Sequence, residues 1–271
     1  MMDLCNYVGG EFVCHSGEEW MHVLEPATGQ RFARVPLSTA EDVDTAVAAA
    51  REAQPVWSSL SISERADWLD RIADALESRY EDIASLESRD TGKPISLARA
   101  VDAHRSVFNF RFFADLLREQ EQEIFEMEDS TNFVVHKPVG VGALITPWNL
   151  PLYLLSWKVA PAIGMGNCVV CKPSELTPMT ADLLMQVIHD IGLPAGVVNL
   201  VHGDGAGAGA PLVAHEDVDL VSFTGGTDTG QKVAASAAPS FKKLSLELGG
   251  KNASIVFADC DMEKTVAGVV R

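Results

Sequence analysis

The sequence predicts an α/β fold built on a doubly wound parallel sheet, and two patterns in its second half predict it. Beyond Val139, short apolar runs of strand length alternate with longer runs of helical period. The expected strands are Val141 to Ile145, Asn167 to Lys172, Val197 to Val201 and Val218 to Phe223. Glycine-rich turns follow the last two of these strands. Alternation of this kind places ligands at the carboxyl ends of the strands.

Composition sets the class of the molecule. The chain has 271 residues, of which 47% are hydrophobic and 22% charged, as is ordinary for a globular protein with a sizeable core. Its net charge of −17 argues against nucleic acid or an anionic membrane as a partner. The start of the chain has neither the basic nor the apolar region of a secretory signal. The five cysteines, an odd number, are scattered and favour a reducing compartment without a disulfide framework. We therefore expect a cytoplasmic protein.

The first part of the chain reads as short strands followed by helices. Tyr7 to Val13 has the pattern of a tight hairpin. Thr39 and Ser61 are placed to cap two helices, the first of which is expected to end before Pro55. A third helix is expected to stop near Gly92.

A long helix is expected from Ala98 to Leu117. Its expected core positions are Val101, Phe108, Phe112 and Leu116. Its expected solvated face carries Arg99, Arg105, Arg111 and Arg118. The acidic stretch and alternating pattern of 119–138 then predict an exposed hairpin that reaches toward another subunit.

A lone carboxylate near the end of the chain suggests acid–base chemistry. Glu247 lies between Leu246 and Leu248 and is followed at once by two glycines. In an extended segment the carboxylate points away from the leucines. Apolar surroundings would raise its pKa toward the range of a general base. The alternative is a solvated glutamate in a turn at a strand end.

The two glycine turns suggest a phosphate site. Backbone N–H groups and a helix dipole at such turns can approach a pyrophosphate. Gly205 to Ala210 fits only the loose form of the dinucleotide-binding pattern. Flexible turns without a ligand remain the alternative.

Four motifs, in this order, resemble those of the NAD(P)-dependent aldehyde dehydrogenase superfamily. They are Pro147-Trp148-Asn149-Leu150-Pro151, Lys172-Pro173-Ser174-Glu175, Phe223-Thr224-Gly225-Gly226 and Leu246-Glu247-Leu248-Gly249-Gly250-Lys251. The resemblance covers nearly the whole chain. Within the superfamily, the stretches Arg105 to Ala114 and Trp148 to Leu155 are most similar to 2-aminomuconic and 2-hydroxymuconic semialdehyde dehydrogenases.

The resemblance implies NAD-dependent oxidation of an aldehyde to the acid through a cysteine thiohemiacetal and hydride transfer. Asn149 would donate to the oxyanion, and Glu247 would activate the water that hydrolyses the thioester. Lys172 and Glu175 would hold the ribose hydroxyls, and a carboxylate there disfavours the 2′-phosphate of NADP. The implied cofactor contacts are Ile145, Pro147, Trp148, Lys172, Ser174, Glu175, Gly205, Gly209, Phe223, Thr224, Gly225, Gly226 and Leu248. The family usually has Ser where Gly226 stands, which implies a weaker or altered grip on the phosphate.

The nucleophile is the difficulty. Family members carry it a few dozen residues beyond the Glu247 motif, and this sequence ends at Arg271. The segment around Cys260 resembles the family's acidic turn after the first strand of the catalytic domain, so we do not expect Cys260 to be the nucleophile. Cys168 and Cys171 fall within an apolar strand on opposite faces, which is poor geometry for a metal or redox pair. We expect no metal site.

Two hypotheses follow. The chain is either the N-terminal portion of an aldehyde dehydrogenase or a catalytically silent NAD-binding or regulatory fragment. In the first case the resemblance divides it into a Rossmann-like NAD-binding domain (1–118 and 139–247), an oligomerisation hairpin (119–138) and the truncated start of the catalytic domain (248–271). The full-length form would be a homo-oligomer. In the family the hairpin pairs with C-terminal strands of a partner, and we expect impaired assembly here because this sequence does not contain those strands. A muconic semialdehyde carries a carboxylate, which Arg105 or Arg111 could bind.

Overall fold

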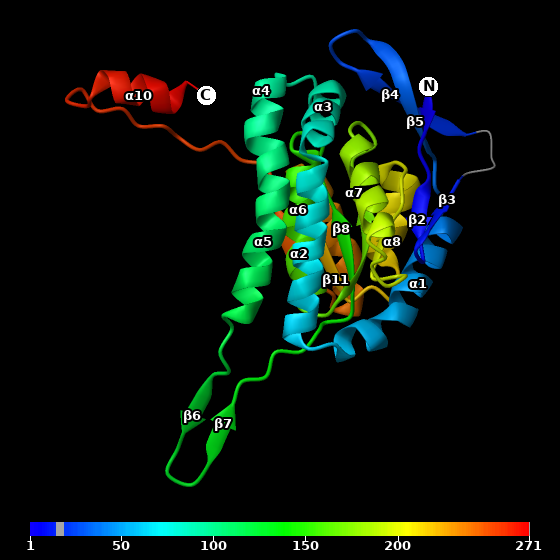
Figure 1. Cartoon of the computed structure of the whole chain (residues 1–271), viewed down its shortest axis with the longest axis vertical. Helices are drawn as coiled ribbons and strands as arrows, with labels where there is room; N and C mark the ends of the chain where they lie inside the picture. Colours follow the sequence, from blue (N-terminus) through cyan, green and yellow to red (C-terminus); the bar gives the residue numbers. More distant parts are fainter. Residues whose placement is uncertain (15–18, 271) are drawn as a thin grey trace.

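A seven-stranded sheet runs through the described part of the molecule, residues 1–14 and 19–270 of the computed structural model (Figure 1). Its strands, in spatial order, are β12 (Lys243–Glu247), β11 (Leu220–Thr224), β8 (Val141–Ile145), β9 (Cys168–Lys172), β10 (Val198–Leu200), β2 (Asn6–Val8) and β3 (Glu11–Val13). The strands from β12 to β10 pair in parallel, and the hairpin β2–β3 adds antiparallel pairs at the far edge. The predicted α/β fold with a parallel sheet is confirmed, with this antiparallel extension. β8 is apolar throughout, and β9 is apolar up to Lys172 at its end, because helices cover both of their faces.

Helices form layers on both sides of this sheet. They are α1 (Ala40–Ser59), α2 (Ile62–Ser78), α3 (Tyr80–Thr91), α4 (Ile95–Leu97), η1 (Ala98–Ala103), α5 (His104–Arg118), α6 (Pro151–Gly164), α7 (Met179–Asp190), η2 (Gly205–Gly209), α8 (Ala210–Ala214), α9 (Thr227–Ala237), η3 (Ala238–Ser240) and α10 (Met262–Val269). The helices α1, α8 and α9 lie on one face, and α6 and α7 on the other, where α2, α3 and α5 form an outer layer (Figure 1). No helix among the described residues is long and apolar enough to cross a bilayer.

Two of the helix starts follow the predicted caps, but one helix end does not. Thr39 and Ser61 each form a capping box, with Asp42 and Glu64 respectively. The expectation that α1 ends before Pro55 was wrong, since the helix continues to Ser59. Trp57 is buried and its indole N–H donates to the Ile163 carbonyl at 2.8 Å. Burial of this side chain outweighs the one backbone hydrogen bond that the proline removes.

The buried face of α5 differs from the predicted one. The side chains of Phe108, Phe112 and Leu116 are exposed, and Val101 in η1 is half-buried. The buried stripe consists of Val107, Phe110, Ala114 and Leu117. This stripe packs against α2 and α6. The sequence carries two apolar stripes at helical spacing, and periodicity alone does not say which one meets the core.

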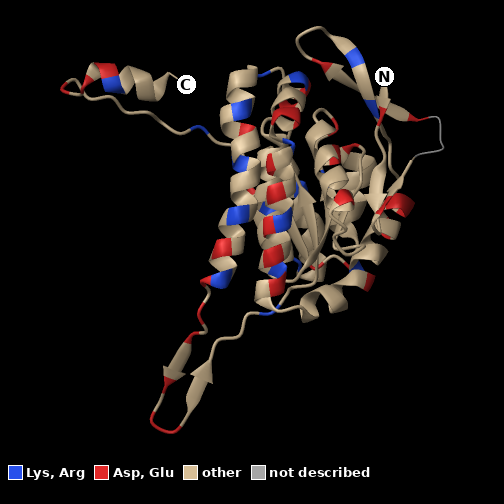
Figure 2. Cartoon of the chain, in the orientation of Figure 1, with Lys and Arg blue, Asp and Glu red and all other residues tan. Residues whose placement is uncertain are grey.

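The predicted solvated face of arginines on η1 and α5 is confirmed. Arg99, Arg111 and Arg118 form ion pairs with carboxylates of α2 and α3, with N–O distances between 2.5 and 3.0 Å. Figure 2 shows the facing acidic and basic positions along α2 and α5. Arg105 differs because it has no carboxylate partner among the described residues and lies instead over the rings of Phe108 and Tyr153.

Residues 119–138 form the predicted exposed hairpin. Strand β6 (Ile124–Glu126) pairs with β7 (Thr131–Phe133), and the two project from the body of the molecule (Figure 1). Both strands are exposed along their whole length, and acidic residues gather at the tip (Figure 2). A smaller sheet, β1 (Met2–Asp3), β5 (Gln30–Pro36) and β4 (Trp20–Glu25), lies at the N-terminal end.

The expectation that no disulfide forms was wrong. Cys5 and Cys14 are bonded, with their Cα atoms 4.4 Å apart. The hairpin register pairs Asn6 with Val13, so the next residues outward face each other across the two strands. Counting cysteines along the chain could not reveal this because the pairing depends on the register.

The segment after β12 has little regular structure. Residues 248–261 form neither helix nor strand, and α10 lies away from the sheet (Figure 1). The strand expected before the acidic turn at 257–262 is not formed. A strand needs a neighbour to pair its backbone groups, and none of the described residues provides one there.

Candidate functional site

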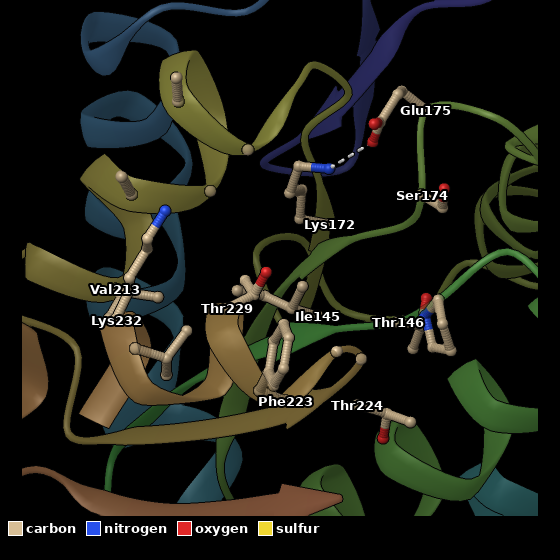
Figure 3. A pocket seen from close by; sticks show the side chains of 18 of the residues that line it. Ile145, Thr146, Lys172, Ser174, Glu175, Val213, Phe223, Thr224, Thr229 and Lys232 are labelled. Carbon is tan, nitrogen blue, oxygen red and sulfur yellow. Dashed lines mark hydrogen bonds and ion pairs between the residues drawn. The ribbon is translucent and has the colours of Figure 1, made fainter. Parts of the chain in front are cut away.

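A cavity of about 580 Å³ lies at the carboxyl ends of β8, β9 and β11, beside α8 and α9. The predicted cofactor contacts on its wall are Ile145, Pro147, Trp148, Lys172, Ser174, Glu175, Gly205, Gly209, Phe223, Thr224, Gly225 and Gly226. The structure therefore brings together, around one cavity, residues that are far apart in the sequence (Figure 3).

Leu248 is the one predicted contact that does not line this cavity. Its side chain lies against Gly230 in α9, where a β-carbon on the glycine would come within 2.3 Å of it. Leu248, the residue that follows β12, packs against α9. The structure thus gives Leu248 a packing contact.

Several wall residues were not predicted from the sequence. They are Thr146, Ala206, Ala210, Val213, Thr229, Lys232, Val233 and Ser236. Four of them lie on a single face of α9, because their positions differ by three, four and seven residues. The helical period after the second glycine turn was a signal that could have identified this face.

Lys172 and Glu175 form the polar corner of the cavity. The Lys172 ammonium lies 3.4 Å from a Glu175 carboxylate oxygen and donates to the Pro173 carbonyl at 3.0 Å. Burial lowers the pKa of Lys172, and the Glu175 charge opposes that effect. Figure 3 shows this pair on one side of the cavity and Lys232 beside Val213 on the other. A donor next to an acceptor is suited to the neighbouring hydroxyls of a ribose.

The second glycine turn leads directly into α9. Gly226 is the N-cap of this helix, which has no side-chain cap, so its first N–H groups are available to an anion. At Gly225 a β-carbon would lie 2.5 Å from the Phe223 ring. At Gly226 a β-carbon would meet nothing within 4 Å. A side chain at 225 would therefore require the Phe223 ring to shift, whereas a side chain at 226 would have open space.

The first glycine turn is helical. Residues 205–209 form a single π-helical turn, and the Asp204 carboxylate accepts from the Gly207 N–H at 2.6 Å. The expected loop is replaced by a helix start that leads into α8.

Asn149 lies in the loop between β8 and α6, next in sequence to Trp148 of the cavity wall. Its side chain is exposed, and the side-chain amide has no partner among the described residues. Its backbone carbonyl accepts from the Lys93 ammonium at 3.1 Å. The amide is therefore free to donate to a bound molecule while the backbone is held from behind.

Glu247 ends β12, next to the second glycine turn. It pairs with Thr224 in the parallel register, and its carbonyl accepts from the Gly225 N–H at 3.0 Å. The apolar surroundings expected for its carboxylate are not provided by the described residues, because the side chain is exposed. The reason is that β12 is an edge strand and only β11 pairs with it.

A buried cation near Glu247 was not predicted as part of the site. The Lys158 ammonium is buried and donates to the Ser222 hydroxyl at 2.7 Å. Burial lowers the pKa of Lys158 to about 8, and the charge of Glu247 opposes the effect. The signal in the sequence was a lysine within an otherwise apolar helix.

The free cysteines Cys168, Cys171 and Cys260 are not among the residues that line the cavity. Cys168 and Cys171 are buried in β9, and burial raises the pKa of Cys168 to about 12 and that of Cys171 further still. Cys260 lies in the segment that extends away from the sheet (Figure 1). Within residues 1–14 and 19–270, no three His, Cys, Asp or Glu side chains are grouped so that they could hold a metal ion.

The chain resembles known proteins over nearly its whole length. Residues 12–271 match the model of the aldehyde dehydrogenase family. The chain is 48% identical over 268 residues to 2-aminomuconic semialdehyde dehydrogenase of Danio rerio, covering 98% of this chain and 55% of that protein. It is 46% identical over 278 residues to 2-hydroxymuconic semialdehyde dehydrogenase of Pseudomonas sp. strain CF600, covering 100% of this chain and 57% of that protein. The chain thus spans about half the length of the curated relatives it matches.

Solved structures match over the same part. Lactaldehyde dehydrogenase from Escherichia coli superposes with a TM-score of 0.96 at 37% identity, over 99% of this chain and 57% of that one. A variant of aldehyde dehydrogenase C from Pseudomonas syringae, in complex with NAD⁺ and octanal, superposes with a TM-score of 0.92 at 40% identity, over 98% and 54% respectively.

Proposed function

Because the chain belongs to the aldehyde dehydrogenase family, we propose that it forms the NAD-binding part of an enzyme that oxidises an aldehyde to a carboxylic acid. The observation that carries this proposal is the shared cavity, whose wall unites residues of three separate motifs at the carboxyl ends of the strands. A relative of the same fold was solved with NAD⁺ bound.

The cavity fits NAD in its polar corner and at its helix start. Lys172 and Glu175 offer a donor and an acceptor to the ribose hydroxyls, and the first turn of α9 offers N–H groups to the pyrophosphate. The Glu175 carboxylate disfavours a 2′-phosphate, so we propose NAD rather than NADP. Bound NAD supplies the acceptor for the hydride that leaves the aldehyde carbon.

Two further side chains are proposed to act on the aldehyde. The free amide of Asn149 would stabilise the oxyanion that forms when a thiolate adds to the carbonyl. Glu247 would take a proton from the water that hydrolyses the thioester. Lys158 lies near Glu247 and adds a positive charge behind this strand edge.

An arginine without a carboxylate partner among the described residues supports a substrate that carries a carboxylate. The two relatives described above are named for muconic semialdehydes, which carry a carboxylate. Arg111 already contacts Asp74 and Glu77, whereas Arg105 has no carboxylate partner among the described residues and lies over Tyr153, close to Asn149 in sequence. We therefore propose Arg105, rather than Arg111, as the binding partner of a substrate carboxylate.

The division of the chain is likewise proposed. Residues 1–118 and 139–247 would form the NAD-binding domain, 119–138 the oligomerisation hairpin of a homo-oligomer, and 248–271 the start of the catalytic domain. The exposed strands β6 and β7, with their unpaired edges, support the role of the hairpin. We propose a cytoplasmic location on the basis of the free thiols. In a reducing compartment the Cys5–Cys14 bond would be open.

A second candidate function is NAD binding without catalysis by this chain. It is favoured by the free thiols of Cys168, Cys171 and Cys260, which are not among the residues that line the cavity. Purified 1–271 is then expected to bind NAD⁺ but to form no NADH with an aldehyde. Activity that Cys260→Ser abolishes would contradict this expectation and identify Cys260 as the nucleophile.

Isothermal titration calorimetry tests the NAD site itself. We expect saturable NAD⁺ binding, about tenfold weaker in Glu175→Ala because a bond to a charged acceptor is worth about 1.5 kcal/mol or more. NADP⁺ should bind more weakly than NAD⁺ to the unchanged chain. Glu263→Ala, which removes an exposed carboxylate on α10, is the control. Absence of NAD⁺ binding to the folded chain would refute the proposed cofactor.

A further inference from the structure

The loop that carries Asn149 is exposed to solvent on one side and held by side chains on the other. Three side chains hold carbonyl groups of this loop and of the first turn of α6. The Trp148 carbonyl accepts from the Thr177 hydroxyl at 3.1 Å, and the Asn149 carbonyl accepts from the Lys93 ammonium at 3.1 Å. The Tyr153 carbonyl accepts from the Asn109 amide at 3.2 Å.

The start of α6 is capped from outside the helix. Leu150 is its N-cap and provides no side-chain acceptor. The Glu87 carboxylate of α3 takes that place and accepts from the Leu152 N–H at 3.0 Å and from the Thr180 hydroxyl at 2.9 Å. A carboxylate near the first turn of a helix is favourable. Glu87 therefore fixes where α6 begins and where the Asn149 loop ends.

Lys93 is the centre of this support. Its ammonium lies 2.8 Å from an Asp102 oxygen and 3.9 Å from a Glu87 oxygen. The Lys93 side chain is 13% exposed, and those of Asp102 and Glu87 are 1% and 0% exposed. One oxygen of each carboxylate has no hydrogen-bond partner. Two buried carboxylates thus hold one ammonium, which in turn donates to the Asn149 carbonyl.

We propose that Lys93, held by Asp102 and Glu87, is a positioning residue that sets the direction of the Asn149 side chain. This inference rests on the proposed function, in which the Asn149 amide binds the oxyanion. Lys93 never meets the substrate in this arrangement. It acts through the Asn149 backbone, whose orientation decides where the free amide points.

The arrangement suits such a role because it is rigid and buried. The second oxygens of Glu87 and Asp102 have no other hydrogen-bond partner among the described residues, so both carboxylates attract the Lys93 ammonium to this one position. Misplacement of a reacting group by about 1 Å can cost roughly 100-fold in rate. Loss of one oxyanion donor costs about 100- to 1,000-fold in kcat. A loosened Asn149 should therefore cost less than a removed one.

The test compares Lys93→Met with Lys93→Arg and Asn149→Ala in the full-length enzyme that contains this chain. We expect Lys93→Met to lower kcat about 10- to 100-fold and to leave the NAD⁺ dissociation constant within about twofold, because Asn149 lies off the cavity wall. Lys93→Arg keeps the charge and a donor and should restore part of kcat. Lys93→Met added to Asn149→Ala should have little further effect. The matched control is Arg99→Met, which breaks an exposed ion pair on η1 without touching the loop.

A second measurement does not depend on catalysis. In ¹⁵N-labelled 1–271, the Asn149 side-chain amide signals, assigned by their loss in Asn149→Ala, should shift in Lys93→Met and stay in place in Arg99→Met. Circular dichroism first checks that Lys93→Met has the same helix content as the unchanged chain, so that a shifted signal does not reflect unfolding. If Lys93→Met does not fold, Lys93→Met with Asp102→Asn removes the uncompensated carboxylate and takes its place.

The outcomes separate the two proposals. An unchanged kcat in Lys93→Met, an equal loss in Arg99→Met, or a parallel rise in the NAD⁺ dissociation constant would overturn the positioning role. Unmoved Asn149 signals would overturn it as well. If the unchanged enzyme oxidises no aldehyde, the proposed function fails, and the amide signals still decide whether Lys93 positions Asn149.

Discussion

The stability of the chain should depend on the titration of Glu87. Burial, with the charge of Asp102 adding to it, raises the pKa of Glu87 from 4.5 to about 7. A carboxyl whose pKa is raised in the folded state stabilises that state below its unfolded pKa and loses this contribution as the pH rises through the folded value. One pKa unit is worth about 1.4 kcal/mol, so the whole effect is about 3 kcal/mol. About 2 kcal/mol of it falls between pH 5.5 and 8.

Glu87→Gln isolates this contribution. The amide keeps an oxygen that can accept from Leu152 and Thr180 but has no charge to titrate. Between pH 5.5 and 8 the free energy of unfolding of the variant should therefore fall by about 2 kcal/mol less than that of the unchanged chain. Urea unfolding followed by circular dichroism measures both values, and the range stays above the sequence pI of about 4.7.

The control is Glu52→Gln, at an exposed carboxylate on α1. It should leave the pH dependence as it is. If Glu87→Gln and the unchanged chain lose stability in parallel from pH 5.5 to 8, then Glu87 does not titrate in this range and the reasoning from its burial fails.

Three further predictions concern the cavity, the substrate and the core. Gly226→Ser should tighten NAD⁺ binding several-fold by calorimetry, since the added hydroxyl has open space beside the start of α9; weaker binding would count against a phosphate at this turn. In the full-length enzyme, Arg105→Ala should lower kcat/KM about 10-fold or more for a carboxylated aldehyde but not for an uncharged one. Arg111→Ala should change kcat/KM equally for the two aldehydes. If Arg105→Ala also changes both values equally, Arg105 does not bind the substrate carboxylate. Phe110→Ala should cost about 3 to 5 kcal/mol in urea unfolding, and Phe112→Ala, half exposed, markedly less; similar costs would mean that the buried face of α5 is misassigned.

The parallel sheet and the cavity wall could be predicted from the sequence because local patterns carry them. Strands that are buried on both faces are continuous apolar runs, so β8 was found with its bounds unchanged. Gly225 marks a position where a β-carbon would crowd the Phe223 ring, and Gly226 is the residue at which α9 begins. Neighbouring carboxyl ends of parallel strands then bring these turns together.

What could not be predicted depends on which surfaces meet. The two apolar stripes of α5 are alike in sequence, and only contact with α2 and α6 distinguishes Phe110 from Phe112. The pairing of Cys5 with Cys14 depends on a hairpin register. Glu247 was expected among apolar neighbours, but flanking leucines in a strand point to the other face and cannot shield it. Lys93 gave no signal because its partners come from three different elements.

The order of the strands has a consequence for how the cavity comes to exist. β8 lies between β9 and β11, yet β11 follows it in the chain only after β9, β10 and four intervening helical elements. The wall therefore cannot close until a late segment has inserted beside an early one, a non-local step that is slow in folding. A ligand that binds only the finished cavity stabilises the native state by mass action. The cofactor would thus act as a reporter of completed folding, and it would protect the chain from unfolding in proportion to its concentration above the dissociation constant.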